Sequence, residues 1–303
     1  MTLLVSGWVA IDEIETPFGE ARGVLGGPAT YAALAGSLFT DVRLLAGVGR
    51  DFPPEFRQAL ARDRIDLAGL STHDAPTSRW GTRYHYDMNT RDTLYTEVGV
   101  NGEWQAWLPE RWADTTSLFA TAFYPTVQRE IMRSLPMLRI SLIDTIKFYI
   151  DTALEDLKAT MAEATFATVN ESEAREIAKT PSIANAGRKL LANGGQGVIV
   201  KLGEYGAAFV SRDDYFVAPG YPLEEIVDPT GAGDTFGGGF MGYLDTVQEV
   251  NVREIRRAMI YGSTVASFAV EGFGPERLLS LTREEVEGRY REFRALTHFE
   301  VDE

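Results

Sequence analysis

The sequence contains no cysteine and only three histidines among its 303 residues. The absence of cysteine excludes disulfides and thiolate metal sites, and it suits a cytoplasmic protein, which is the location we expect. The histidines, at positions 73, 85 and 298, have no spacing typical of metal ligands. A structural zinc site is therefore not expected.

Positive charge and long apolar runs are also scarce. The 29 Lys and Arg are outnumbered by 44 Asp and Glu, which gives a formal net charge of −15. Such an acidic chain is poorly suited to nucleic acid or to an anionic membrane surface. No run approaches the roughly 20 apolar residues that span a bilayer, and the N-terminal residues do not resemble a signal peptide. Small molecules are the expected partners.

The rest of the chain alternates apolar segments with helical patterns, without an internal repeat or a linker. Such alternation predicts a doubly wound α/β fold, in which helices cover both faces of a mostly parallel sheet. One domain over residues 1–303 is expected. Strands are predicted at 3–5, 42–48, 118–122, 139–143, 165–169, 198–201, 206–210 and 215–217, and helices at 31–39, 54–64, 126–135, 151–162, 172–179, 182–191 and within 252–293.

Polar residues follow several of these strands, namely Asp12, Asp144, Asn170 and Asp234. In open α/β sheets, ligands bind beyond the carboxyl ends of the strands. We therefore expect one cleft to join these residues.

The most informative segment is Asp228-Pro-Thr-Gly-Ala-Gly-Asp-Thr-Phe-Gly-Gly-Gly-Phe240. A glycine-rich turn precedes a helical pattern, so free N–H groups and the helix dipole would favour an anion there. A carboxylate, Asp234, stands inside this turn, where it would repel a bound phosphate but would serve as a base for an attacking hydroxyl. Phosphoryl transfer is the favoured interpretation; the alternative is a glycine turn closed by an Asp cap.

Two common phosphate motifs do not describe this segment. No Gly-x-x-x-x-Gly-Lys-Ser/Thr loop occurs, and the glycines lack the Gly-x-Gly-x-x-Gly spacing directly after a strand. A second glycine motif, Gly26-Gly27-Pro28-Ala29-Thr30-Tyr31-Ala32-Ala33, lies near the N-terminus. Together the two segments resemble the signatures of the ribokinase-like (PfkB) sugar and nucleoside kinases, and their order and separation extend the resemblance over essentially the whole chain.

The resemblance implies a ribokinase-like fold with a small β-strand lid, formed by approximately residues 8–24 and 78–103. It implies Asp234 as catalytic base, ionised at its helix start, with an anion hole in the backbone of Gly231, Ala232, Gly233 and Asp234. It places the acceptor at Asp12, Gly26 and Gly27. An Asn that often follows Gly-Gly in the family is replaced here, so Thr30 or Tyr31 takes that place. In the lid, Asn89 and Arg91 are either substrate ligands or exposed strand residues.

For ATP and Mg²⁺, the resemblance points to Asn170 and Glu173, which match an Asn-x-x-Glu element; capping of the next helix is the alternative. Lys201 stands where the family often has Thr, and is either a phosphate ligand or a solvated strand-end lysine. Gly203, Gly206 and Gly262 are expected near the nucleotide. Asp228 either borders a K⁺ site, as in some family members, or holds its turn. Asp144 and Lys147 are further candidates.

The sequence thus predicts an ATP-dependent phosphotransferase acting on an alcohol group of a sugar or sugar-like acceptor. A nucleoside or cyclitol kinase is the alternative, with stacking surfaces for a base at Tyr31, Trp80, Tyr84 and Tyr86. A non-catalytic ligand sensor is a further alternative. Unpaired lid strands suggest a homodimer formed through the lid.

Overall fold

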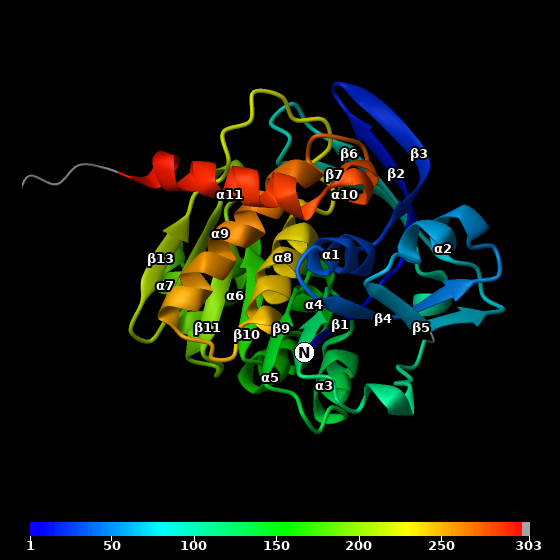
Figure 1. The fold of residues 1–303 in the computed structure, drawn as a ribbon, viewed down its shortest axis with the longest axis horizontal. Helices are drawn as coiled ribbons and strands as arrows, with labels where there is room; N and C mark the ends of the chain where they lie inside the picture. The colour runs from blue at the N-terminus through cyan, green and yellow to red at the C-terminus, as the bar shows by residue number, and fades with distance from the viewer. Residues whose placement is uncertain (103, 299–303) are drawn as a thin grey trace, which may run out of the picture.

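The structure is a computed structural model and describes residues 1–102 and 104–298. Residue 103, with which the predicted lid segment ends, and residues 299–303 lie outside this description. Within the described residues, nine strands form the main sheet in the order β13-β12-β11-β10-β9-β8-β1-β4-β5 (Figure 1). They are β1 (Thr2–Ser6), β4 (Asp41–Gly49), β5 (Ile65–His73), β8 (Ser117–Ala120), β9 (Ile140–Ile143), β10 (Phe166–Asn170), β11 (Gly197–Lys201), β12 (Ala207–Ser211) and β13 (Tyr215–Ala218).

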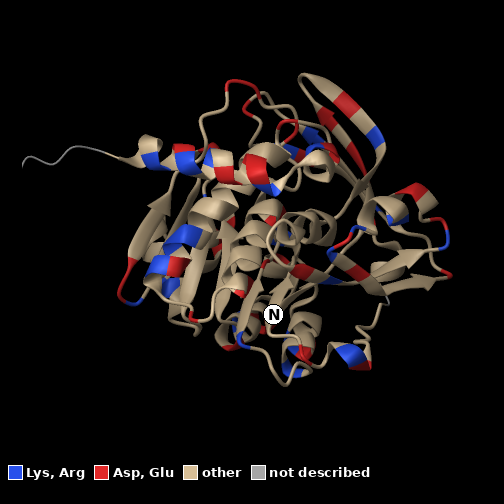
Figure 2. Cartoon of the chain, in the orientation of Figure 1, with Lys and Arg blue, Asp and Glu red and all other residues tan. Residues whose placement is uncertain are grey.

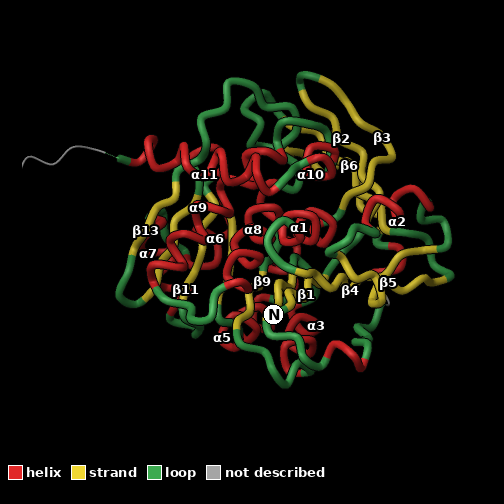
Figure 3. The backbone as a smooth tube through the Cα atoms, in the orientation of Figure 1, coloured by secondary structure: helices red, strands yellow, loops and turns green. Residues whose placement is uncertain are grey.

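The sheet is parallel except at one edge, where β12 pairs antiparallel with both β11 and β13. Helices cover both faces of the sheet; they are red and the strands yellow in Figure 3. One face carries α1 (Pro28–Ser37), α8 (Ala232–Thr246) and α9 (Val252–Ala269), with α10 (Glu276–Ser280) and α11 (Arg283–Thr297) packed against α9. The other carries α3 (Pro125–Arg133), α4 (Lys147–Thr152), α5 (Leu154–Glu163), α6 (Glu171–Ala178) and α7 (Ile183–Leu191). The doubly wound prediction is confirmed.

A second sheet stands beside the carboxyl ends of the main strands. In the described residues it has the order β3-β2-β6-β7 and consists of β2 (Ala10–Thr16), β3 (Gly19–Gly26), β6 (Ser78–Tyr84) and β7 (Arg91–Glu97). These strands fall in the two segments predicted to form the lid. Asp12, predicted to follow the first main-sheet strand, lies within β2 and therefore belongs to this second sheet.

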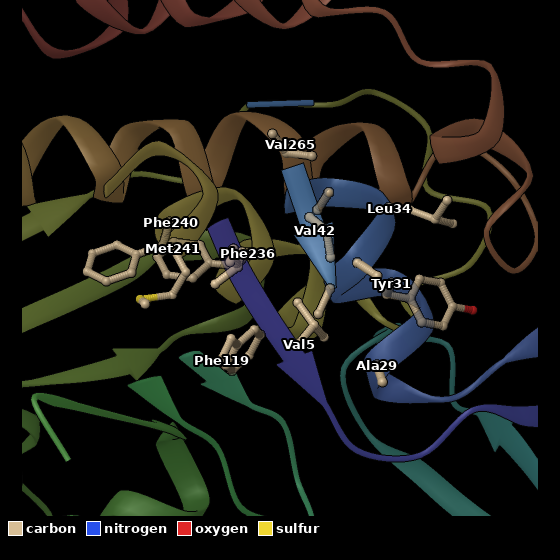
Figure 4. Close-up of a cluster of buried hydrophobic side chains, with 14 of the residues drawn as sticks. Val5, Ala29, Tyr31, Leu34, Val42, Phe119, Phe236, Phe240, Met241 and Val265 are labelled. Carbon is tan, nitrogen blue, oxygen red and sulfur yellow. The ribbon is translucent and has the colours of Figure 1, made fainter. Parts of the chain in front are cut away.

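The core beneath α1, α8 and α9 is tightly packed because small residues line the helix contacts. A Cβ on Gly238 would lie 2.4 Å from the Ala32 carbonyl oxygen. The backbones of α8 and α1 therefore lie in direct contact at this point. Figure 4 shows the rings of Phe119, Phe236 and Phe240 gathered in this core. This packing fixes the start of α8, where the predicted base stands.

Charges are interspersed over many elements of the molecule (Figure 2). In the described part of the chain, none of the helices is both long and apolar enough to cross a membrane. Trp104 and Trp112 are buried, whereas Trp107 is 65% exposed.

One buried carboxylate, Asp245 near the end of α8, stabilises the opposite end of the sheet. It accepts hydrogen bonds from Thr40 Oγ1 at 2.6 Å and from Ser117 Oγ at 2.6 Å, at the amino ends of β4 and β8. Asp245→Ala would leave these hydroxyls unpaired, and we expect it to lower the free energy of unfolding by about 2–4 kcal/mol. Chemical denaturation would measure this, with the exposed Asp213→Ala as control. An unchanged midpoint would contradict it.

Candidate active site

The glycine turn before α8 depends on close contact with α1. Gly231 is the N-cap of α8 and has a φ of 74°. A Cβ at this position would also lie 2.3 Å from the Tyr31 ring. Tyr31 is only 1% exposed, and its ring packs against the turn. The structure therefore gives Tyr31 a supporting position, and not the open stacking surface expected for a base.

The carboxylate of Asp228 holds the other side of the same turn. It accepts hydrogen bonds from the backbone N–H of Thr230 at 2.8 Å and of Gly274 at 2.9 Å. These bonds match the turn-holding alternative for Asp228. Ala232 N–H donates to the Pro229 carbonyl at 3.2 Å, which weakens its expected part in the anion hole. Helix geometry gives the N–H of Gly233 no intrahelical acceptor.

The Gly26–Gly27 pair brings the backbone against Asp12. A Cβ on Gly26 would lie 2.0 Å from Asp12 Oδ2, and Gly27 N–H donates to this oxygen at 3.3 Å. Asp12 Oδ1 is buried and has no hydrogen-bond partner among the described residues. An unpaired buried carboxylate oxygen is costly, so it indicates a site for a ligand hydroxyl. Thr30, in contrast, is fully buried and donates to the Gly26 carbonyl at 2.6 Å.

Lys201 and Asp144 form a buried ion pair beside the glycine turn. Lys201 Nζ lies 2.6 Å from Asp144 Oδ2, and their side chains are 18% and 3% exposed. The same Nζ would lie 3.1 Å from a Cβ on Gly233. Lys201 therefore points at the start of α8, which contradicts the solvated alternative. Gln128, which sequence reasoning missed, donates to the Asp144 carbonyl at 2.9 Å and fixes the backbone there.

Asn170 and Glu173 form a capping box at the start of α6. Asn170 Oδ1 accepts the Glu173 N–H at 2.9 Å, and the Asn170 N–H donates to Glu173 Oε2 at 2.8 Å. The capping alternative is thus present. Glu173 nevertheless is only 6% exposed, and the charges of Asp144 and Lys201 act on it. Capping and a place in the charged cluster are compatible.

Three carboxyl groups of this cluster have displaced pKa values. Burial raises the pKa of Asp234 to about 7, and the charge of Asp144 adds to this, while Lys201 and Arg91 oppose it. This opposes the expectation that the helix start keeps Asp234 ionised, because desolvation raises the pKa more than the helix dipole lowers it. Burial likewise raises the pKa of Asp12 and of Glu173 to about 7. Perturbed carboxyl groups of this kind concentrate at functional sites.

The glycines predicted to lie near a nucleotide occupy two different places. Gly203 and Gly206 form the turn after β11, where the side chain of Asn89 lies beside Gly203: its Oδ1 would be 3.0 Å from a Cβ there. Gly262 is buried in α9, and a Cβ on it would lie 2.9 Å from the Phe236 carbonyl of α8. Gly262 is therefore a helix-packing residue, and its prediction as a nucleotide contact is not supported.

Lys147, a further candidate from the sequence, pairs with Glu176 and not with Asp144 or Lys201.

The second sheet contributes Arg91, which is an exposed strand residue at the start of β7, in agreement with one of the two alternatives. The guanidinium of Arg91 lies over the Trp80 ring, 5.0 Å from its centroid, and Arg91 Nη1 donates to Tyr84 OH at 3.3 Å. Tyr84 OH also accepts a hydrogen bond from Thr230 Oγ1 at 3.3 Å. The second sheet is thus joined directly to the glycine turn.

A sequence model of the pfkB family of carbohydrate kinases matches residues 16–280. The chain belongs to this family. It is therefore an enzyme of a kinase family whose members act on sugars or nucleosides. The cytidine kinase of Thermococcus kodakarensis is 31% identical to this pfkB-family chain over 254 residues, covering 80% of this chain and 88% of the relative.

Solved structures share the fold of this pfkB-family protein. A nucleoside kinase of Burkholderia thailandensis, solved with inosine, has a TM-score of 0.76 at 20% identity, covering 97% of this chain and 99% of the other. An Escherichia coli protein named as a candidate ribokinase II, solved with ATP and Mg²⁺, has a TM-score of 0.78 at 19% identity, covering 96% and 99%. At these identities the likeness establishes the fold and leaves the substrate to be argued from the site.

Proposed function

We propose that this protein transfers the γ-phosphoryl group of ATP to a hydroxyl of a sugar or nucleoside, with Asp234 as the base. One observation carries the proposal: Asp234 stands in the first turn of α8 directly after Gly233, against which the Lys201 ammonium lies, and its charge also acts on Asp12. Asp12 supplies an unpaired oxygen for an acceptor, and Lys201 supplies a cation beside the glycine turn. A base between a hydroxyl site and a phosphate site is the arrangement that phosphoryl transfer requires.

In the proposed reaction, the acceptor oxygen forms a bond to the γ-phosphorus as the bond to the β,γ-bridging oxygen breaks. The hydroxyl proton passes to Asp234, and ADP leaves. A hydroxyl is far less acidic than a carboxylic acid, so the proton moves late, as the loose transition state permits. A base with a pKa of about 7 is well matched to this task near neutral pH. The N–H of Gly233 and the ammonium of Lys201 would stabilise the phosphate oxygens.

The acceptor proposal rests on Asp12. A carboxylate with one oxygen engaged by Gly27 and the other free accepts hydrogen bonds from neighbouring hydroxyls. Vicinal hydroxyls of a sugar ring or of a ribose would satisfy it equally well. This is why sugars and nucleosides both fit.

Mg²⁺ would be held near Glu173. Among the described residues, no group of three or more His, Asp or Glu is arranged to hold a metal. That suits Mg²⁺, which commonly keeps several waters and takes few protein ligands beside the phosphates. Glu173 is a buried carboxylate beside the Asp144–Lys201 pair, and a cation would relieve its repulsion with Asp144. When bound, Mg²⁺ would neutralise charge on the phosphate oxygens.

A nucleoside acceptor is the second candidate, favoured by the 31% identity to a cytidine kinase. Of the four aromatic residues expected to stack on a base, Tyr31 is buried in the core and Tyr84 is hydrogen-bonded to the glycine turn. Tyr86 is 82% exposed and lies against Phe18. Trp80 is the remaining one of the four, and one face of its ring is covered by the guanidinium of Arg91.

The test is release of ADP from Mg-ATP over a panel of sugars, cyclitols and nucleosides, with and without K⁺. The panel includes cytidine and other pyrimidine nucleosides. We expect turnover that depends on one class of acceptor. Mass spectrometry of the product would verify a single added phosphate. ATP binding without acceptor-dependent turnover across the panel would overturn the kinase proposal and favour a ligand sensor.

A further inference from the structure

The inner face of the second sheet carries a row of residues directed at the glycine turn. Asp12 on β2 is the direct neighbour of Trp80 on β6, and Tyr84 on β6 is the direct neighbour of Arg91 on β7. Neighbouring residues in register point to the same face of a sheet. Arg83, one residue before Tyr84, points to the opposite face and pairs there with Glu15 at 2.6 Å.

Arg91 is held in place from two sides and has no carboxylate partner. Its guanidinium stacks on Trp80 and donates to Tyr84, whose hydroxyl is bonded to Thr230 in the glycine turn. Among the described residues, Arg91 forms no ion pair. Lys201, the other cation here, is already paired with Asp144. A guanidinium fixed by stacking and left without an anion is suited to bind one.

The contacts of Arg91 and its neighbours place it between the two halves of the site. Its stacking partner Trp80 is the direct neighbour of Asp12, on the proposed acceptor side. Asn89, two residues before Arg91, lies beside Gly203 in the turn after β11, on the proposed nucleotide side. A cation in this place lies near the point where the phosphoryl group would pass from donor to acceptor, and its charge acts on Asp12, Glu173 and Asp234.

We propose that Arg91 is a catalytic residue that contacts the phosphoryl group during transfer, and that the second sheet delivers it to the site. The inference rests on the proposed kinase function and goes beyond it by naming the group that stabilises the transition state from outside α8. Because Arg91 stands on the second sheet, its position depends on contact between Tyr84 and Thr230. Transfer is thereby tied to the placement of that sheet.

The test compares Arg91→Gln and Arg91→Lys with Arg83→Gln, a matched change on the opposite face of the same sheet. For each we would measure kcat, the KM of ATP and acceptor, and the affinity for MgADP with aluminium fluoride, which mimics the transferred group. We expect Arg91→Gln to lower kcat by about 10²–10³-fold with KM values changed less than about threefold. Arg91→Lys should recover little, because an ammonium does not reproduce the planar, stacked fork. Arg83→Gln should behave as the wild type.

Loss of tight aluminium fluoride binding in Arg91→Gln, with ADP affinity kept, would support contact with the transferred group. A raised acceptor KM with kcat retained would overturn the inference and make Arg91 an acceptor ligand. Equal kinetics of Arg91→Gln and Arg83→Gln would also overturn the inference about Arg91. The kinase proposal would still stand in that case, because the wild type turns over. No turnover by the wild type with any acceptor would overturn both. Circular dichroism would verify that each variant is folded.

Discussion

Asp234→Asn is expected to lower kcat by about 10³–10⁴-fold while the protein still folds and binds ATP. The substitution keeps the size of the side chain and removes the oxygen that would accept the proton. It also removes a buried carboxylate with a pKa raised to about 7, so the folded state loses an unfavourable charge. We therefore expect stability at pH 8 to be unchanged or increased, which separates a catalytic defect from a folding defect.

The measurements are the initial rate with the acceptor found by the panel, the ATP affinity by calorimetry and the thermal midpoint. Asp213→Asn, an exposed residue in the turn between β12 and β13, is the control and should retain wild-type rates. A rate within tenfold of the wild type would exclude Asp234 as the base, whatever the acceptor.

The pH profile offers a second measurement on the same residue. The pKa of Asp234 is raised, so its basic form is lost as pH falls below about 7. In the wild type, kcat/KM should therefore fall on the acid side with a slope that approaches tenfold per pH unit well below pH 7. Asp12 and Glu173 also have pKa values raised to about 7, and the slope should be steeper if either must be ionised. A flat profile between pH 5 and pH 8 would be incompatible with this assignment.

Much of the fold could be predicted because the parallel strands are fully buried. Strands such as β1, β8 and β10 are short apolar runs with buried side chains on both faces, which is what a covered parallel sheet requires. β5, at Ile65–His73, was not predicted. It lies at the edge of the sheet, mixes buried with exposed residues, and becomes a strand through parallel pairing with β4.

The site was predictable where a motif determines backbone geometry. It was less predictable where the role of a side chain depends on how the surrounding elements pack. The glycine turn and the Gly26–Gly27 pair require glycine because Tyr31 and Asp12 approach the backbone. Which side chains face a ligand is a different question. Tyr31 and Gly262 lie in motif segments but are used in packing. The pairing of Lys201 with Asp144 joins residues 57 positions apart, and only the sheet brings them together.

Lys201→Met is expected to lower kcat/KM for ATP by about 10²–10³-fold. The ammonium points at Gly233 and is surrounded by Asp144, Glu173 and Asp234. Without it, the phosphates of ATP would enter a site that holds several carboxylates and one fewer cation. The pKa of Asp234 should also rise further, because Lys201 opposes its increase. The acid limb of the pH profile should therefore move to higher pH.

The stability of this variant must be separated from its activity, because removal of one partner of a buried ion pair costs about 3–5 kcal/mol. Asp144 would be left with an unpaired buried charge. The double variant Lys201→Met/Asp144→Asn removes that charge and should regain much of the lost stability without regaining ATP affinity. If the double variant regained both, Lys201 would serve only to neutralise Asp144. If Lys201→Met kept the wild-type kcat/KM for ATP, Lys201 would not contact a phosphate. Because stability and ATP affinity are expected to respond differently, the pair of variants distinguishes a lysine that binds phosphate from one that only balances a carboxylate.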